Sequence, residues 1–172
     1  LHPQKYVLDL MSIILGGMMS SRMFIEIREK MGAAYYIRTY NNSDSDTGAL
    51  ATFAGIDNKK IFDVIKTILK EYKKLTNIKV SEAELKKAKD YLKGKMVLRM
   101  ESSDAQASFY GVQELMENRT LTMAEIFKKI DKVSVKDIMK IAKDVFKNEK
   151  LNLAIIGPYK GKEEEFKKIL KF

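Results

Sequence analysis

Hydrophobic residues recur every three or four positions along most of the chain, which is the spacing of amphipathic helices. The first such stretch begins near Pro3, which suits a first helical turn, and Gly16-Gly17 form its stop. Its apolar positions are Tyr6, Val7, Leu10, Met11, Ile14 and Leu15. A second helix is expected to start at Ser20 or Ser21, either of which can cap it, and to stop at Gly32.

After Gly32 the pattern changes to one that favours strands. The stretch YYIRTYNN, Tyr35 to Asn42, is rich in β-formers, and ALATFAG, Ala49 to Gly55, reads as a second strand. The intervening SDSDTG has the composition of a turn. The two strands are therefore predicted to form a hairpin with a rather long loop.

Helical spacing returns after the hairpin and continues to residue 146. Asp57 can cap a helix running to about Leu75, and Ser103 begins a helix that ends near Glu117. Three further starts carry a hydroxyl residue followed three positions later by an acid, the signature of a capping box. These pairs are Ser81 with Glu84, which starts a long helix to around Met100, Thr122 with Glu125, and Ser134 with Asp137.

The last part of the chain begins with LNLAIIG, Leu151 to Gly157, a short apolar run that we interpret as a buried strand. The tail EEEFKKILKF can form a closing helix. Roughly seven or eight helices and three strands indicate a single α+β domain over residues 1–172, a two-layer arrangement of one antiparallel sheet packed against several helices. Three strands make a thin sheet.

Composition narrows the possible functions. The formal charge of +9 and the pI near 9.5 suggest nucleic acid, but only five of the 32 basic residues are arginine, the usual residue for bidentate phosphate and base contacts. Those arginines are Arg22, Arg28, Arg38, Arg99 and Arg119. The lysines alternate with acids as on solvated helix faces, so we expect no nucleic-acid partner. No apolar run approaches the roughly 18 residues that span a bilayer, so we expect no membrane partner.

Metal and nucleophile chemistry are restricted as well. The chain has no cysteine and a single histidine, His2, so a zinc site or a Ser-His-Asp triad built from this chain alone is not expected. The chain begins with neither an initiator methionine nor a leader peptide, and we interpret it as a piece of a longer protein. We take the cytoplasm as the working assumption for the cellular compartment of this protein.

Arg28 and Tyr35, on either side of the helix end predicted at Gly32, are candidates for a structural or a functional role. At ~100° per residue, Arg28 lies only ~40° from Phe24, at the border of the apolar stripe, where an arginine commonly snorkels or pairs with a carboxylate. Tyr35 begins the strand directly after the turn, and its ring can be core while its hydroxyl reaches a partner. From spacing alone, both a structural and a functional role remain open.

The stretch ILGGMMSSRMFIEIREKMGAAYYI, Ile14 to Ile37, closely resembles the central motif of the M16 metallopeptidase family, which includes the mitochondrial processing peptidases, insulin-degrading enzyme and pitrilysin. The hairpin, VSEAELKKAKDYLKGKMV, ESSDAQASFYGVQELM and LNLAIIGP follow in the family's order. The resemblance is to the C-terminal type of domain, which lacks the zinc motif. It also implies that this chain starts just after the family's opening strand.

The resemblance implies a function shared between two domains or subunits. Family members carry the inverted zinc motif H-x-x-E-H in another domain, so zinc would be bound by a partner domain of the same longer chain or by a homodimer or heterodimer partner. The opposite half of the chamber supplies an arginine and a tyrosine seven positions apart, which bind the backbone of an unfolded peptide substrate. Arg28 and Tyr35 have that spacing and sit in the matching motif.

This sequence departs from the usual motif at three positions, but keeps both donors. Met18 replaces a common glycine, Met31 a common basic residue, and Ala33 a common leucine. The resemblance therefore implies the peptide-binding half of a zinc peptidase, inactive by itself. The alternative is a non-catalytic structural subunit of the same fold, as in respiratory-complex core proteins.

Overall fold

The computed structural model describes residues 4–44 and 46–172, so His2, the predicted first turn at Pro3 and one residue of the SDSDTG turn lie outside the described residues. Helices dominate, as the sequence predicts. The elements are, in chain order, α1 Lys5–Ser12, η1 Ile13–Gly17, η2 Phe24–Lys30, β1 Ala34–Ser43, β2 Gly48–Ile56, η3 Asn58–Lys60, α2 Ile61–Asn77, α3 Glu82–Arg99, α4 Ser103–Glu117, α5 Met123–Asp131, α6 Val135–Val145, η4 Asn148–Lys150 and α7 Glu163–Ile169.

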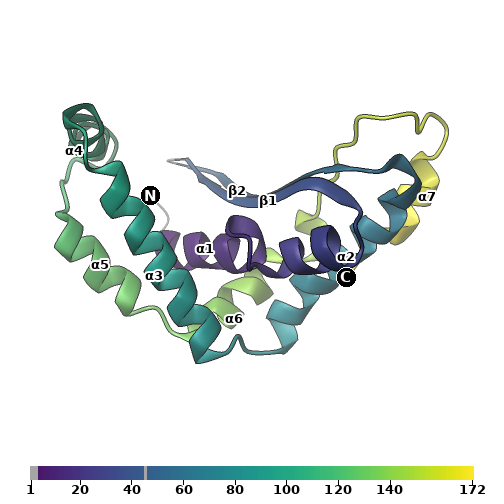
Figure 1. Cartoon of the computed structure of the whole chain (residues 1–172), viewed down its shortest axis with the longest axis horizontal. Coiled ribbons are helices and arrows are strands. Elements are labelled where there is room, and N and C mark those ends of the chain that lie inside the picture. The colour runs from purple at the N-terminus through teal and green to yellow at the C-terminus, as the bar shows by residue number, and fades with distance from the viewer. Residues whose placement is uncertain (1–3, 45) are drawn as a thin grey trace.

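The β1–β2 hairpin forms one layer and the helices form the other (Figure 1). The two strands are antiparallel, with Thr39 opposite Thr52 and Arg38 opposite Phe53. Ile37 and Thr39 are buried, whereas Arg38 and Phe53 are exposed. Because side chains alternate between the faces of a sheet, the hairpin turns one face to the helices and the other to solvent. This confirms the predicted sheet covered on one face.

The first helical stretch occupies the centre of the helical layer. α1 contacts β1, α3, α5 and α6, and the π-helical turn η1 continues it beneath the hairpin. Four of its side chains are at most 1% exposed: Leu10, Met11, Ile14 and Leu15. A helix with apolar residues around most of its circumference is one that the fold encloses. The other elements are therefore arranged around α1 and η1.

The hairpin lies directly against η1 at Gly16. A Cβ atom on Gly16 would lie 2.6 Å from the backbone nitrogen of Thr39, so no larger residue fits without displacing the strand. The hydroxyls of Thr39 and Thr52 are 2.8 Å apart, and Thr52 is 2.6 Å from the phenol oxygen of Tyr72 on α2. Tyr72 in turn stacks on Phe146, just after α6, with ring centroids 4.4 Å apart. This series of contacts ties the hairpin to three helical segments.

One predicted element is wrong. Leu151 to Ile156 forms no strand, and the side chain of Ile156 is fully exposed. The apolar run predicted burial, but a strand also needs a neighbouring strand for its backbone hydrogen bonds, and within the described residues the sheet contains only β1 and β2. The predicted closing helix is present as α7, although it is shorter than the tail.

The predicted helix starts are confirmed in most cases. Thr122 with Glu125 and Ser134 with Asp137 form complete capping boxes at α5 and α6. Ser81 caps α3 by accepting a hydrogen bond from the backbone N–H of Glu84. The capping box predicted there is incomplete, however, because the Glu84 carboxylate is bound elsewhere, by Arg22.

The predicted cap at Ser20 or Ser21 takes a different form. The Ser21 carbonyl accepts the first helical hydrogen bond, from the backbone N–H of Ile25. The Ser21 hydroxyl is buried, and it has no hydrogen-bond partner in the described part of the chain. The side-chain cap is therefore missing, and the serine fills space in the core.

The end of the fold farthest from α7 carries apolar side chains that face solvent. α4 projects there from the end of α3 (Figure 1). Leu115 on α4 is 85% exposed, and Leu98, Val112 and Met116 are also exposed. Only Gln113 of α4 is buried, where it exchanges hydrogen bonds with the backbone of Leu121.

The close contact at Gly16 gives a stability prediction. We expect Gly16→Ala to lower the free energy of unfolding by about 2–3 kcal/mol, because the added methyl group would press on the β1 backbone. Gly94, inside α3 with nothing within 4 Å, is the matched control, and Gly94→Ala should raise stability by about 0.5–1 kcal/mol. Urea unfolding followed by circular dichroism measures both; equal effects in the two variants would contradict the close approach.

Asp9 gives a prediction of pH dependence. Burial raises the pKa of this α1 carboxyl above its usual 3.8, although Asn41 Nδ2 donates a hydrogen bond to it at 2.8 Å and Lys5 lies nearby. The folded state therefore holds the proton more tightly than the unfolded state, and stability falls as pH rises from 3.8 through the raised pKa. Asp9→Asn keeps an acceptor for Asn41 and should be more stable than wild type at pH 7, with the advantage vanishing below pH 3.8. Thermal unfolding across this range tests it, and a pH-independent difference would contradict it.

Candidate functional site

The corner between η2 and β1 is held by several hydrogen bonds. Gly32 has a left-handed φ of 54°, which ends the helix as predicted. The backbone N–H of Ala33 donates to the Ile27 carbonyl at 3.0 Å, across the turn. From η3, Lys60 Nζ donates to the carbonyls of Met31 at 3.0 Å and Gly32 at 3.3 Å. The ammonium thereby satisfies helix-end carbonyls and complements the negative end of the helix dipole.

Tyr35 lies near the start of β1, at an irregularity in the pairing of the two strands. Ala34 pairs with Ile56 and Tyr36 pairs with Gly55, so Tyr35 has no partner in the register. Such bulges redirect a side chain away from the regular alternation. The ring of Tyr36 lies directly over Gly55, where a Cβ would meet it at 2.4 Å. Tyr35 is 86% exposed, so its ring is not in the core, one of the alternatives that the sequence left open.

Arg28 points its guanidinium along the surface of the same corner. Its Cζ atom lies 5.1 Å from the centroid of the Phe24 ring, one helical turn earlier. This is the snorkelling alternative for a border arginine, with a cation–π contact in place of a carboxylate. Neither Arg28 nor Tyr35 forms a side-chain hydrogen bond or an ion pair with any described residue. Both therefore keep their donors available to a ligand.

Arg22 begins the same helical stretch, but its guanidinium binds a carboxylate, whereas that of Arg28 lies over a ring. Its Nε and Nη2 atoms donate to the two carboxylate oxygens of Glu84 at 2.8 Å each, and both side chains are largely buried. The hydrogen bonds to Glu84 raise the pKa of Arg22 further above its usual value. This bidentate pair joins the start of the helix to the start of α3. We assign Arg22 a structural role.

The solvent face of the hairpin is aromatic. Tyr36, Arg38, Tyr40 and Phe53 are exposed on it, and the rings of Tyr40 and Phe53 lie 5.9 Å apart. This surface was missing from the sequence-based site. The alternation in YYIRTY contained the signal, since every second residue after Tyr36 takes the same face.

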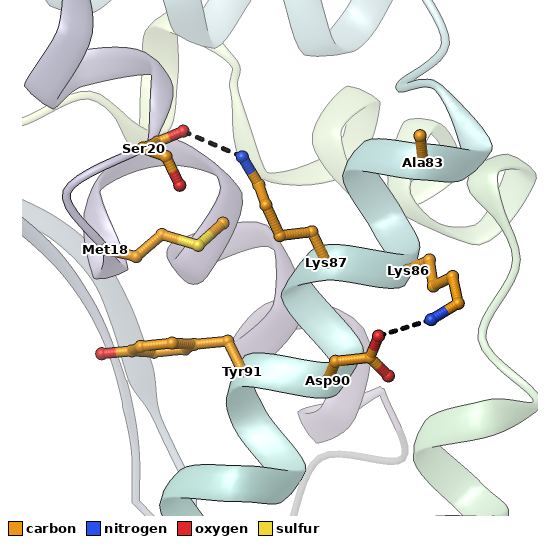
Figure 2. A pocket seen from close by; sticks show the side chains of 7 residues that line it. All are labelled: Met18, Ser20, Ala83, Lys86, Lys87, Asp90 and Tyr91. Carbon is orange, nitrogen blue, oxygen red and sulfur yellow. Dashed lines mark hydrogen bonds and ion pairs between the residues drawn. The ribbon is translucent and has the colours of Figure 1, made fainter.

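A shallow groove runs between the segment after η1 and the first turns of α3 (Figure 2). Its polar groups are mutually bound: Lys87 Nζ lies 3.4 Å from the Ser20 carbonyl oxygen, and Lys86 pairs with Asp90 at 2.7 Å. Met18, Ala83 and Tyr91 complete its lining. Because its cations already have partners, this groove offers little to a ligand.

Across residues 4–44 and 46–172, no three His, Cys, Asp or Glu side chains gather closely enough to hold a metal ion. Within that part of the chain, every helix is too short or too polar to cross a membrane.

Comparison with known proteins identifies the class. Residues 1–92, more than half of the chain, match the family described as the peptidase M16 inactive domain, and the chain belongs to that family. It is 31% identical to a protein named zinc protease YmxG from Bacillus subtilis, over 91% of this chain and 38% of that protein. A zinc protease of Streptomyces coelicolor is 29% identical, over 93% and 35% respectively. The chain thus spans little more than a third of these relatives.

Solved structures agree on the fold. A protease from Helicobacter pylori superposes with a TM-score of 0.75 at 25% identity, covering 83% of this chain and 34% of that one. A chain of complex III2 from Candida albicans gives 0.74 at 26% identity, with 83% and 36% covered. The M16 inactive domain of Pseudomonas fluorescens gives 0.71 at 19% identity, which supports the fold alone.

The different environments of two arginines give a third prediction. We expect Arg22→Lys to destabilise the protein by about 1–2 kcal/mol, because an ammonium cannot form the bidentate pair with Glu84. Arg28→Lys, on the same helical stretch but without a carboxylate partner among the described residues, should change stability by less than about 0.5 kcal/mol. Chemical denaturation distinguishes them, and equal losses would contradict the assignment.

Proposed function

We propose that this chain is the peptide-binding, chamber-forming half of a zinc-dependent M16 peptidase. The family assignment and the zinc-protease names of its relatives support this proposal. The relatives are more than twice as long as the region they share with this chain, which leaves room for a zinc-bearing domain. That domain belongs either to the same longer chain or to another subunit.

One observation carries the proposal: Arg28 and Tyr35 present unengaged donors on the two sides of a rigid corner. A guanidinium and a phenol can donate to the carbonyl of a bound peptide and to the negative charge that develops on its oxygen during attack. Because the Lys60 and Ala33 hydrogen bonds fix the corner, little reorganisation is needed when a peptide arrives.

The partner half would contribute the reaction's nucleophile. Zinc held there would lower the pKa of a bound water and polarise the scissile carbonyl. This chain's role is to hold the peptide and to exclude water when the two halves close. An extended peptide suits the surface, since the exposed rings of Tyr40 and Phe53 offer apolar contacts farther along the same hairpin.

The second candidate is a structural subunit without catalysis. Its support is the likeness to a chain of complex III2 from Candida albicans, at 26% identity and a TM-score of 0.74. In such a subunit the same surfaces would serve assembly. An H-x-x-E-H motif elsewhere in the natural protein or in its partner favours the peptidase, and its absence from both would exclude catalysis.

Kinetics of the complete enzyme test the assigned roles. Arg28→Ala and Tyr35→Phe should each lower kcat/KM for peptide cleavage by about tenfold to a thousandfold, with zinc content unchanged. Tyr36→Phe is the matched control, because its hydroxyl belongs to the neighbouring regular position, and it should retain activity. Wild-type turnover in both Arg28→Ala and Tyr35→Phe would refute the proposal.

A further inference from the structure

α2 has a lysine-rich face beside the last residues of the chain. Lys66, Lys70, Lys73 and Lys74 follow helical spacing and share that face with Asn77. They line a groove of about 430 Å³ together with Leu69 of α2, Ile78 just after α2, Ile169 at the end of α7, and Lys171 and Phe172 after it. Figure 1 places α2 and α7 side by side at this end of the molecule. We call this the α2–α7 groove.

Most of the lysines that line the α2–α7 groove have no acidic partner among the described residues. Lys66, Lys70, Lys73 and Lys171 form no ion pair with any described residue. Lys74 pairs only with Glu71, whose carboxylate is 3% exposed and so is hidden from solvent. Some lysines elsewhere do pair with acids, as Lys86 does with Asp90, Lys93 with Asp131 and Lys167 with Glu164. The lining of the groove, by contrast, contains five lysines and no acidic residue.

Glu26, an acid outside the groove, already has another lysine as its partner. Glu26 on η2 is bound by Lys30, and this hydrogen bond is the main reason that its pKa is lowered. Lys74 and Lys70 lower it further, so the positive potential of the groove extends to Glu26. A cluster of unpaired lysines pays an electrostatic cost that an anionic ligand relieves.

The floor of the groove is apolar. Ile78 follows α2 directly and is 60% exposed, Leu69 lies beneath the lysines, and Ile169 and Phe172 close the opposite side, half-buried. Exposed apolar side chains beside unpaired lysines suit a ligand with both properties. Phosphate-rich ligands use the charges but leave such a floor in contact with water.

We propose that the α2–α7 groove binds an acidic peptide segment of a protein partner that carries apolar anchor residues. Carboxylates of the segment pair with Lys66, Lys70 and Lys73, while its apolar side chains cover Ile78 and Phe172. Lys66 and Lys74 are eight residues apart, or about 12 Å along the helix axis, which matches roughly four residues of an extended peptide.

A defined peptide tests the proposal on the full chain. The probe is a fluorescein-labelled peptide of alternating glutamate and leucine or phenylalanine, with binding followed by anisotropy at low and moderate salt. We expect saturable binding that Lys70→Glu/Lys73→Glu weakens at least tenfold and that Ile78→Ser also weakens. Lys95→Glu/Lys132→Glu makes the same charge change at exposed lysines outside the groove and should leave binding unchanged.

Other outcomes would overturn the proposal. Equal weakening by both charge-reversal pairs would mean that the net charge alone attracts the peptide. A glutamate-only peptide binding as tightly as the probe would remove the role of the apolar floor. Tighter, Lys70/Lys73-dependent binding of a single-stranded oligonucleotide or of vesicles with phosphatidylserine would assign the groove to phosphate groups instead. Circular dichroism of each variant separates these results from loss of fold.

Discussion

The contact between Gly16 and Thr39 fixes where the sheet stands relative to the helices. At this point the backbone of η1 and the backbone of β1 are separated by less than a side chain. The hydroxyl series Thr39, Thr52 and Tyr72 then carries the same constraint through β2 to α2. Because the hairpin is a sheet of two strands, which is marginal alone, its geometry is set by these contacts more than by its own ladder. The corner at Gly32 directly precedes β1, so the position of β1 also sets the position of the corner.

The two arginines of the helical stretch before Gly32 have different surroundings. Arg22 and Arg28 lie on one helical stretch, yet Glu84 engages the first with both oxygens while the second rests on Phe24. A partly buried ion pair needs good geometry to stabilise the fold, and the Arg22–Glu84 pair has two parallel hydrogen bonds of 2.8 Å. An exposed, unpaired guanidinium adds little to folding, and this is why Arg28 is proposed as a peptide-binding residue. Tyr35, displaced from the register, is the second residue of that proposal.

Helix positions, the hairpin and the family could be predicted from local patterns, because hydrophobic spacing and caps such as Thr122 and Ser134 act within a few residues. Features that depend on distant partners could not. The Glu84 carboxylate binds Arg22, 62 positions away, and does not complete the capping box at the start of α3. The bulge at Tyr35 depends on the pairing of two strands, and the strand expected at 151–157 lacks a neighbour. The α2–α7 groove combines segments that are far apart in the sequence, residues 66–78 and 169–172.

α4 buries few of its side chains against the rest of the fold. A helix of 15 residues is marginal in water, and this one has Gln113 as its sole buried side chain. Its amide protons should therefore exchange with solvent sooner than those of α1, and a protease should cut there before it reaches the enclosed helices. A second polypeptide that covered Leu115 and Met116 would slow both events. Hydrogen exchange and proteolysis at α4 would therefore report whether a second polypeptide covers this helix.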